Sequence, residues 1–195
     1  MVSSMRHSRQ PSAISHDAAS ISDDAGLQRV RAAALTLNPN SAAAHNGAGL
    51  LAIDSNQPAA AVTAFEAAVA VDANNASYSA NLGNARRAIG DRAGAEQAYR
   101  RALDVDPGTA DAANGLGVLL VEANRPGDAA PWFERAIAAA PDMVEARLNL
   151  GIALQQTGQP ARAADAYRLV LSARGNHPHE KDAAARLLGA MGSAR

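Results

Sequence analysis

Four glycines recur at one fixed interval in this chain, at Gly49, Gly83, Gly117 and Gly151. The same interval separates four alanines and four aromatic residues, which are Ala61, Ala95, Ala129 and Ala163, then Phe65, Tyr99, Phe133 and Tyr167. A fixed period of this length is typical of a helical solenoid, in which each unit cannot bury its apolar face alone and stacks on its neighbours. We therefore expect one small unit written four times.

The composition favours helices over strands. Alanine is abundant, charged residues make up 19% of the 195 residues and aromatic residues only 3%. Alanine has the highest helix propensity and allows helices to pack closely. The sequence therefore predicts an all-α fold with no sheet.

Charge and cysteine content exclude several classes of function. The formal net charge is -1, and Lys181 is the only lysine, so the chain lacks a polycationic surface for a phosphate backbone. We expect no nucleic-acid partner. Cysteine is absent, which removes disulfides, thiol catalysis and cysteine-ligated zinc.

The chain carries no apolar run of signal-peptide length near residues 1–20 and none long enough to span a membrane. We expect no membrane partner and a cytoplasmic location, or a periplasmic one if the segment belongs to an exported parent protein.

The repeat predicts how the chain is organised. Residues 1–23 are rich in serine and are expected to form a flexible arm. The helical pattern begins at Asp24 with a partial repeat. The predicted order is a domain over 24–195 with a partial repeat 24–41, repeats 42–75, 76–109, 110–143 and 144–177, and a terminal helix 178–192 that closes the stack.

Each unit should contain two helices joined by a short turn. A helix commonly ends in a left-handed residue that glycine, or less readily asparagine, adopts at low cost. These residues recur at the expected place, as Asn56, Gly90, Asn124 and Gly158. Prolines suited to the first turn of a helix follow shortly after, at Pro58, Pro126 and Pro160.

These motifs resemble the tetratricopeptide repeat over about residues 25–192. The resemblance rests on Asn-Leu-Gly at 81–83 and 149–151, Gly-Leu-Gly at 115–117, the spaced alanines and aromatics, and Pro107 or Pro141. It implies a right-handed superhelical solenoid of antiparallel helix pairs. The chain departs from the family where a tryptophan is frequent, at His45, Ser79, Ala113 and Arg147.

Residue size assigns packing roles. A glycine on the first helix should let the second helix of its pair approach closely, and the aromatic should fill space toward the next unit. Trp132 is expected to pack at the edge of a unit interface. Pro131 should remove a hydrogen bond and bend its helix unless that helix begins late.

A second periodicity lies above the first. The first and third units share Asn46 with Asn114 and Phe65 with Phe133, whereas the second and fourth share Asn81 with Asn149 and Tyr99 with Tyr167. Our hypothesis is that a block of two units was duplicated, so the surface should alternate along the stack.

In tetratricopeptide arrays the first helices line a concave groove that usually holds an extended peptide or a partner's helix. The resemblance therefore implies a groove lined by Asn46, Leu50, Asp54, Ser77, Asn81, Asn84, Arg87, Asp111, Asn114, Val118, Glu122, Glu145, Asn149, Ile152 and Gln156.

Amides recur in every unit of that groove, and an asparagine can both donate to and accept from a peptide backbone. The series resembles the asparagine ladder of the glycosyltransferase that adds N-acetylglucosamine to proteins. Bracing of helix contacts is the alternative role for these side chains.

Acidic residues outnumber Arg87 in the groove, so a neutral or basic segment is the better electrostatic match. The clamp by which co-chaperones of the family hold acidic tails needs cations. The matching positions here are Asn46, Leu50, Asn81, Asp111 and Gly115, so we expect no such clamp.

Motifs for catalysis or metal binding fail on inspection. Gly47-Ala48-Gly49 and Gly115-Leu116-Gly117 lack the third glycine of a dinucleotide fingerprint. The run 104–108 lacks the later ligands of a calcium loop, and His177, His179 and Glu180 are expected to be surface residues. We expect no enzyme, cofactor or metal.

Three hypotheses for function remain. The first is a non-enzymatic scaffold that binds a peptide or helix in the groove. The second is a self-assembling module, with a second copy of the chain as the partner. The third is the substrate-recognition segment of a larger enzyme.

Overall fold

The computed structural model describes residues 38 and 40–192, and this part of the chain is all-α. Its helices are α2 (Ala42–Asp54), α3 (Pro58–Val71), α4 (Ala76–Ala88), α5 (Arg92–Val105), α6 (Ala110–Glu122), α7 (Pro126–Ala139), α8 (Val144–Gln156), α9 (Pro160–Ser172) and α10 (Pro178–Gly192). The expected arm and nearly all of the partial repeat lie outside the described residues.

The turns inside the pairs form as the sequence predicts. Asn56 and Asn124 have φ values of 55° and 58°, and Gly90 and Gly158 have 83° and 73°. These left-handed residues end the first helix of each pair and turn the chain back. Pro58, Pro126 and Pro160 each begin a second helix, where a missing N–H leaves no bond unmade.

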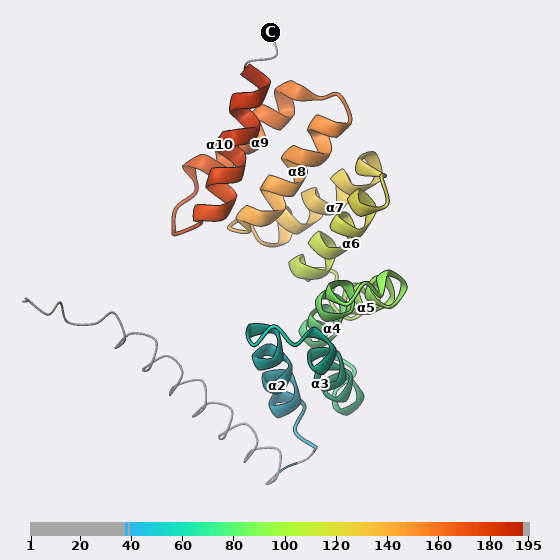
Figure 1. Cartoon of the computed structure of the whole chain (residues 1–195). Coiled ribbons are helices and arrows are strands. Elements are labelled where there is room, and N and C mark those ends of the chain that lie inside the picture. The colour runs from blue at the N-terminus through green and yellow to red at the C-terminus, as the bar shows by residue number, and fades with distance from the viewer. Residues whose placement is uncertain (1–37, 39, 193–195) are drawn as a thin grey trace, which may run out of the picture.

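The helices form sequential antiparallel pairs that stack from α2 and α3 at one end to α10 at the other (Figure 1). Each helix packs against the next, and the first helices also contact one another, α4 with α6, α6 with α8, and α8 with α10. The predicted solenoid of helix pairs is confirmed. The first helices therefore share one side of the stack.

Each repeated glycine lies against an aromatic ring. A Cβ added to Gly49 would stand 2.4 Å from a ring carbon of Phe65, and one added to Gly117 would stand 2.5 Å from Phe133. Gly83 and Gly151 meet Tyr99 and Tyr167 in the same way. The glycine therefore makes room for the second helix, as expected, because the ring that it meets is carried by that helix.

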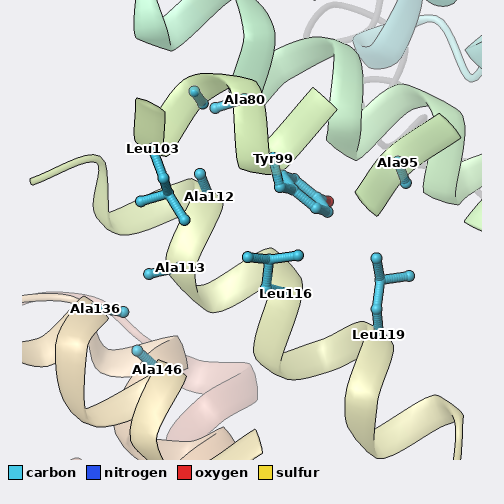
Figure 2. Close-up of a cluster of buried hydrophobic side chains, with 11 residues drawn as sticks. Ala80, Ala95, Tyr99, Leu103, Ala112, Ala113, Leu116, Leu119, Ala136 and Ala146 are labelled. Atoms are coloured by element: carbon cyan, nitrogen blue, oxygen red, sulfur yellow. The ribbon is translucent and has the colours of Figure 1, made fainter. Parts of the chain in front are cut away.

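The apolar side chains between pairs form clusters rather than one central core. Figure 2 shows the cluster around Tyr99, in which Leu116 and Leu119 of α6 point toward the preceding pair. Trp132 is half-buried and packs against this cluster, as predicted for the edge of a unit interface. Pro131 is exposed within α7, and α7 does not begin late, since it starts at Pro126.

The last helix closes this end of the described stack. Ala184 of α10 is fully buried, and Leu187, Leu188 and Met191 pack against the cluster around Tyr167. No helix in the described part of the chain is long and apolar enough to cross a membrane.

Candidate functional site

The candidate site is the face on which α2, α4, α6 and α8 lie side by side. The predicted groove residues all fall on these four helices. Packing brings α4 to α6 and α6 to α8, and a hydrogen bond between Asn81 and Asn46 links α4 to α2. Their exposure differs. Leu50, Asp54, Ser77, Asn84, Asp111, Glu122, Glu145 and Gln156 are exposed, Asn46, Asn81, Arg87, Val118, Asn149 and Ile152 are half-buried, and Asn114 is buried.

Two pairs of asparagines bridge neighbouring first helices. The Asn81 amide donates to Oδ1 of Asn46 at 2.9 Å, which joins α4 to α2. The Asn149 amide donates to Oδ1 of Asn114 at 3.0 Å, which joins α8 to α6. The second pair stands two units after the first and has the same geometry, so the pairs recur in alternate units.

The second pair extends to a carboxylate. Asn114 donates through Nδ2 to Oε1 of Glu145 at 3.2 Å, so Asn114 is bonded on both of its polar atoms. With 7% of its surface exposed, Asn114 has less to offer a ligand than the other asparagines of the site. Its main effect is to hold α8 against α6.

The asparagine series is interrupted between the second and third units. The position equivalent to Asn81 is Gly115, and a Cβ there would stand 2.3 Å from Cζ of Tyr99. The larger tyrosine of the second unit therefore takes the space that an asparagine side chain would need. The structure brings the asparagines together as two separate pairs, not as one continuous ladder.

Tyr99 and Arg87 form a polar centre beside this interruption. The Tyr99 hydroxyl donates to Oδ1 of Asn84 at 2.7 Å. Burial raises the pKa of this hydroxyl above its ordinary value, although the nearby positive charge of Arg87 opposes the shift. Arg87 donates to Glu122 at 3.3 Å, which ties the end of α4 to the end of α6.

The sequence did not point to Arg92 or to the tyrosine hydroxyls. Arg92 lies 3.4 Å from the second oxygen of Glu122, so two guanidinium groups face that carboxylate. The hydroxyl of Tyr167 donates to Gln155 at 2.8 Å, much as Tyr99 donates to Asn84. The alternation of phenylalanine and tyrosine was the signal that could have indicated these polar contacts.

The charge of the site therefore differs between its parts. Glu122 is neutralised by its two arginines, whereas Asp54, Asp111 and Glu145 are exposed carboxylates without a cation among the ion pairs of the described residues. No group of three or more histidine, aspartate or glutamate side chains in the described residues is arranged to hold a metal ion. The arrangement offers hydrogen bonds and a moderate negative potential.

Helix pairs with a repeated glycine and aromatic, stacked so that their first helices share a face, define a helical-repeat protein. The sequence model of the tetratricopeptide repeat matches residues 47–91, 80–144 and 120–178, which together make up more than half of the chain. The chain belongs to the tetratricopeptide repeat family. Such repeats are generally protein–protein interaction modules and typically non-catalytic.

Solved structures share the fold at low sequence identity. The crystal structure of MamA is 22% identical, with a TM-score of 0.66 over 90% of this chain and 98% of that chain. PilF of Pseudomonas aeruginosa is 18% identical, with a TM-score of 0.73 over 90% and 82%. YrrB, described as a tetratricopeptide repeat protein with an unusual peptide-binding site, is 23% identical, with a TM-score of 0.62 over 85% and 84%. No curated protein matches the sequence.

Proposed function

We propose that this protein is a non-enzymatic interaction module that binds an extended polypeptide segment across α2, α4, α6 and α8. The observation that carries the proposal is the recurrence of the two asparagine pairs on neighbouring first helices. Family membership and the peptide-binding site described for YrrB support it.

The asparagine pairs leave hydrogen-bonding groups for a ligand. An amide has two N–H donors and two acceptor lone pairs. In the first pair, Asn81 uses one N–H and Asn46 uses one lone pair, so the Asn81 oxygen and the Asn46 amide nitrogen remain available. Both side chains are half-buried rather than enclosed. They match the alternating donors and acceptors of an extended main chain.

The charge of the face selects among segments. Asp54, Asp111 and Glu145 are exposed, and the arginines of the site are engaged with Glu122. A neutral or basic segment is favoured, because an acidic one would meet like charges without a free cation to offset them.

The test uses defined peptides. Twelve-residue peptides selected from a random phage-displayed library are synthesised, and their Kd values are measured by isothermal titration calorimetry. We expect Asn81→Ala to weaken binding by about tenfold, the equivalent of roughly 1.4 kcal/mol. Asn74→Ala is the matched control, because Asn74 is exposed in the turn before α4 and belongs to neither asparagine pair.

Two results would count against the proposal. One is that the selected peptides bind the Asn81→Ala and Asn74→Ala variants equally. The other is that peptides rich in glutamate are selected over those rich in lysine, which would contradict the charge argument.

Self-assembly is a second candidate because α2 presents exposed apolar side chains. Leu50 and Ile53 are 42% and 40% exposed. Burying such surface against a second copy is favourable by about 25 cal/mol per Å². Light scattering after size-exclusion chromatography tests this: a mass that falls to the monomer on dilution, and stays monomeric in Leu50→Asp, supports it, and a monomer at every concentration excludes it.

A further inference from the structure

A cleft of about 870 Å³ opens between α3 and α5, away from the asparagine pairs. We call it the α3–α5 cleft; Val69 of α3, Ser79 and Leu82 of α4, and Ala98 and Arg101 of α5 line it. Ser79 and Asn81 lie about 160° apart around α4, so the cleft faces away from the proposed groove. It is therefore separate from the site described above.

The charged residues at the rim largely pair with one another. Glu66 lies 2.8 Å from Arg86, and Glu96 lies 2.7 Å from Arg100. The buried floor consists of small and apolar side chains, and Val69, Leu82 and Ala98 belong to one cluster. An occupant is thus expected to be apolar where it meets the floor, and uncharged.

The next unit shows what fills the equivalent space. A shift of one unit along the sequence carries Val69, Ser79 and Leu82 onto Leu103, Ala113 and Leu116, which belong to the cluster that Trp132 packs against. The same shift carries Ala98 onto Trp132 itself. The α3–α5 cleft has the surroundings of that indole ring but an alanine in its place.

The arginine that lies over the Trp132 ring also has a counterpart in the α3–α5 cleft. Arg135 lies 5.5 Å from the centroid of the Trp132 ring and donates to the carbonyl of Pro107. Its counterpart Arg101 lines the α3–α5 cleft and is exposed. A ring entering this cleft would meet a guanidinium in the same register, a contact that stabilises by about 0.5–1 kcal/mol at an exposed site.

The fourth unit differs at the position of Ser79. There Arg147 stands at the position of Ser79 and donates to the carbonyl of Pro141. Ser79 is small and fully buried, and its hydroxyl has no hydrogen-bond partner among the described residues. Leaving such a group unsatisfied costs about 1–3 kcal/mol, so Ser79 adds a destabilising polar group to the floor of this cleft.

From these comparisons we propose that the α3–α5 cleft binds an aromatic side chain, of the size of tryptophan, presented by a partner polypeptide. The ring lies on Val69, Leu82 and Ala98, with the Arg101 guanidinium over its exposed face. The site is a second contact surface, independent of the proposed groove.

The test is a titration of the ¹⁵N-labelled protein with N-acetyl-L-tryptophanamide, followed by backbone amide chemical shifts. We expect saturable shifts at residues 69, 79, 82, 98 and 101, with a Kd between about 0.1 and 10 mM, the range for a ligand of this size. N-acetyl-L-leucinamide, which has no ring, should bind about two- to fivefold more weakly.

Ala98→Trp is the blocking variant, because it builds the arrangement of Trp132 into this cleft. It should abolish the shifts, whereas Ala60→Trp, at an exposed position of α3, should leave them unchanged. Ser79→Arg, which copies the Arg147 of the fourth unit, is a second block that reaches the cleft from α4. Circular dichroism checks that each variant is folded.

Three results would overturn the proposal: no saturable shifts in the wild-type protein, shifts that map to α2, α6 or α8 instead, or shifts that persist in folded Ala98→Trp. The wild-type titration decides the matter even if a blocking variant fails to fold.

Discussion

Gly117 is held against the ring of Phe133, and this contact predicts the cost of adding a single methyl group. A Cβ at residue 117 would stand 2.5 Å from a ring carbon, where ordinary contact begins at 3.4 Å. The ring must therefore retreat by about 1 Å in a close-packed interior. Phe133 is fully buried, so it cannot move without shifting α7 or the neighbouring unit.

Two opposing effects set how much Gly117→Ala changes the free energy of unfolding. Overpacking of a well-packed site typically costs about 1–3 kcal/mol. Replacing glycine by alanine inside a helix stabilises by about 0.8–1.0 kcal/mol. The net destabilisation is about 0–2 kcal/mol, so the variant alone does not isolate the clash.

Gly189→Ala is the control that separates the two effects. Gly189 also lies inside a helix, but a Cβ there meets nothing within 4 Å. It should gain the propensity term without the clash, so the two variants should differ by about 1–3 kcal/mol in the free energy of unfolding. At this chain length, 1 kcal/mol shifts the Tm by about 2–4 °C.

The assay is urea unfolding followed by circular dichroism at the helix band, with the midpoint as the readout because long repeat arrays need not unfold in two states. A further variant, Phe133→Leu, shortens the opposing side chain. In that background Gly117→Ala should cost less than in the wild type, the coupling expected of residues in contact. Equal midpoints for Gly117→Ala and Gly189→Ala would refute the reasoning.

Three other predictions concern polar groups. Burial raises the pKa of Tyr167 to about 12 from an ordinary 10.0, so its contribution to stability is full below pH 10 and is lost as pH rises toward 12. Over that range the unfolding free energy of Tyr167→Phe should therefore fall less steeply than that of the wild type, and parallel curves of unfolding free energy against pH would contradict this. Asn149→Ala leaves the buried Asn114 oxygen without its donor and should lower the free energy of unfolding by about 1–3 kcal/mol. The loss should exceed that of Asn81→Ala, because Asn46, the partner of Asn81, is only half-buried, and urea midpoints in the reverse order would be inconsistent with this. Glu122→Gln should change the free energy of unfolding by less than about 1 kcal/mol, because the ion pairs of Glu122 are solvent-accessible. A larger loss in thermal melts would show that its pairs with Arg87 and Arg92 are stronger than surface pairs usually are.

Much of the fold could be predicted from the sequence because the repeat samples each position four times. The recurrence of Asn56, Gly90, Asn124 and Gly158 identified the turns, since a left-handed residue is a local requirement that few residue types meet. The aromatic residue in each second helix likewise indicated a packing position.

The contacts inside the candidate site were harder to predict. Which asparagines pair depends on the offset between neighbouring first helices, and that offset is set by packing between units. The break between Asn81 and Asn114 arises because Tyr99 reaches over Gly115, a contact between residues of different units. Arg92 takes the first position of the second helix, which holds proline in the other units, and nothing in that pattern indicates that its side chain reaches Glu122.

The open α3–α5 cleft likewise could not be predicted from the sequence. The sequence revealed that Ser79 stands where the family often has tryptophan, but not whether neighbouring side chains would fill the space. Only the comparison of Ala98 with Trp132 in their packed surroundings distinguishes the open second unit from the third.

The central claim is that a polypeptide segment binds across the first helices through the asparagine pairs. The most direct measurement is amide chemical-shift mapping of a selected, unlabelled twelve-residue peptide on the ¹⁵N-labelled protein. The account predicts shifts along α2, α4, α6 and α8 that include the side-chain amides of Asn46 and Asn81, and their loss in Asn81→Ala but not in Asn74→Ala. Shifts confined to the second helices α3, α5, α7 and α9, with the asparagine amides unmoved, would contradict it.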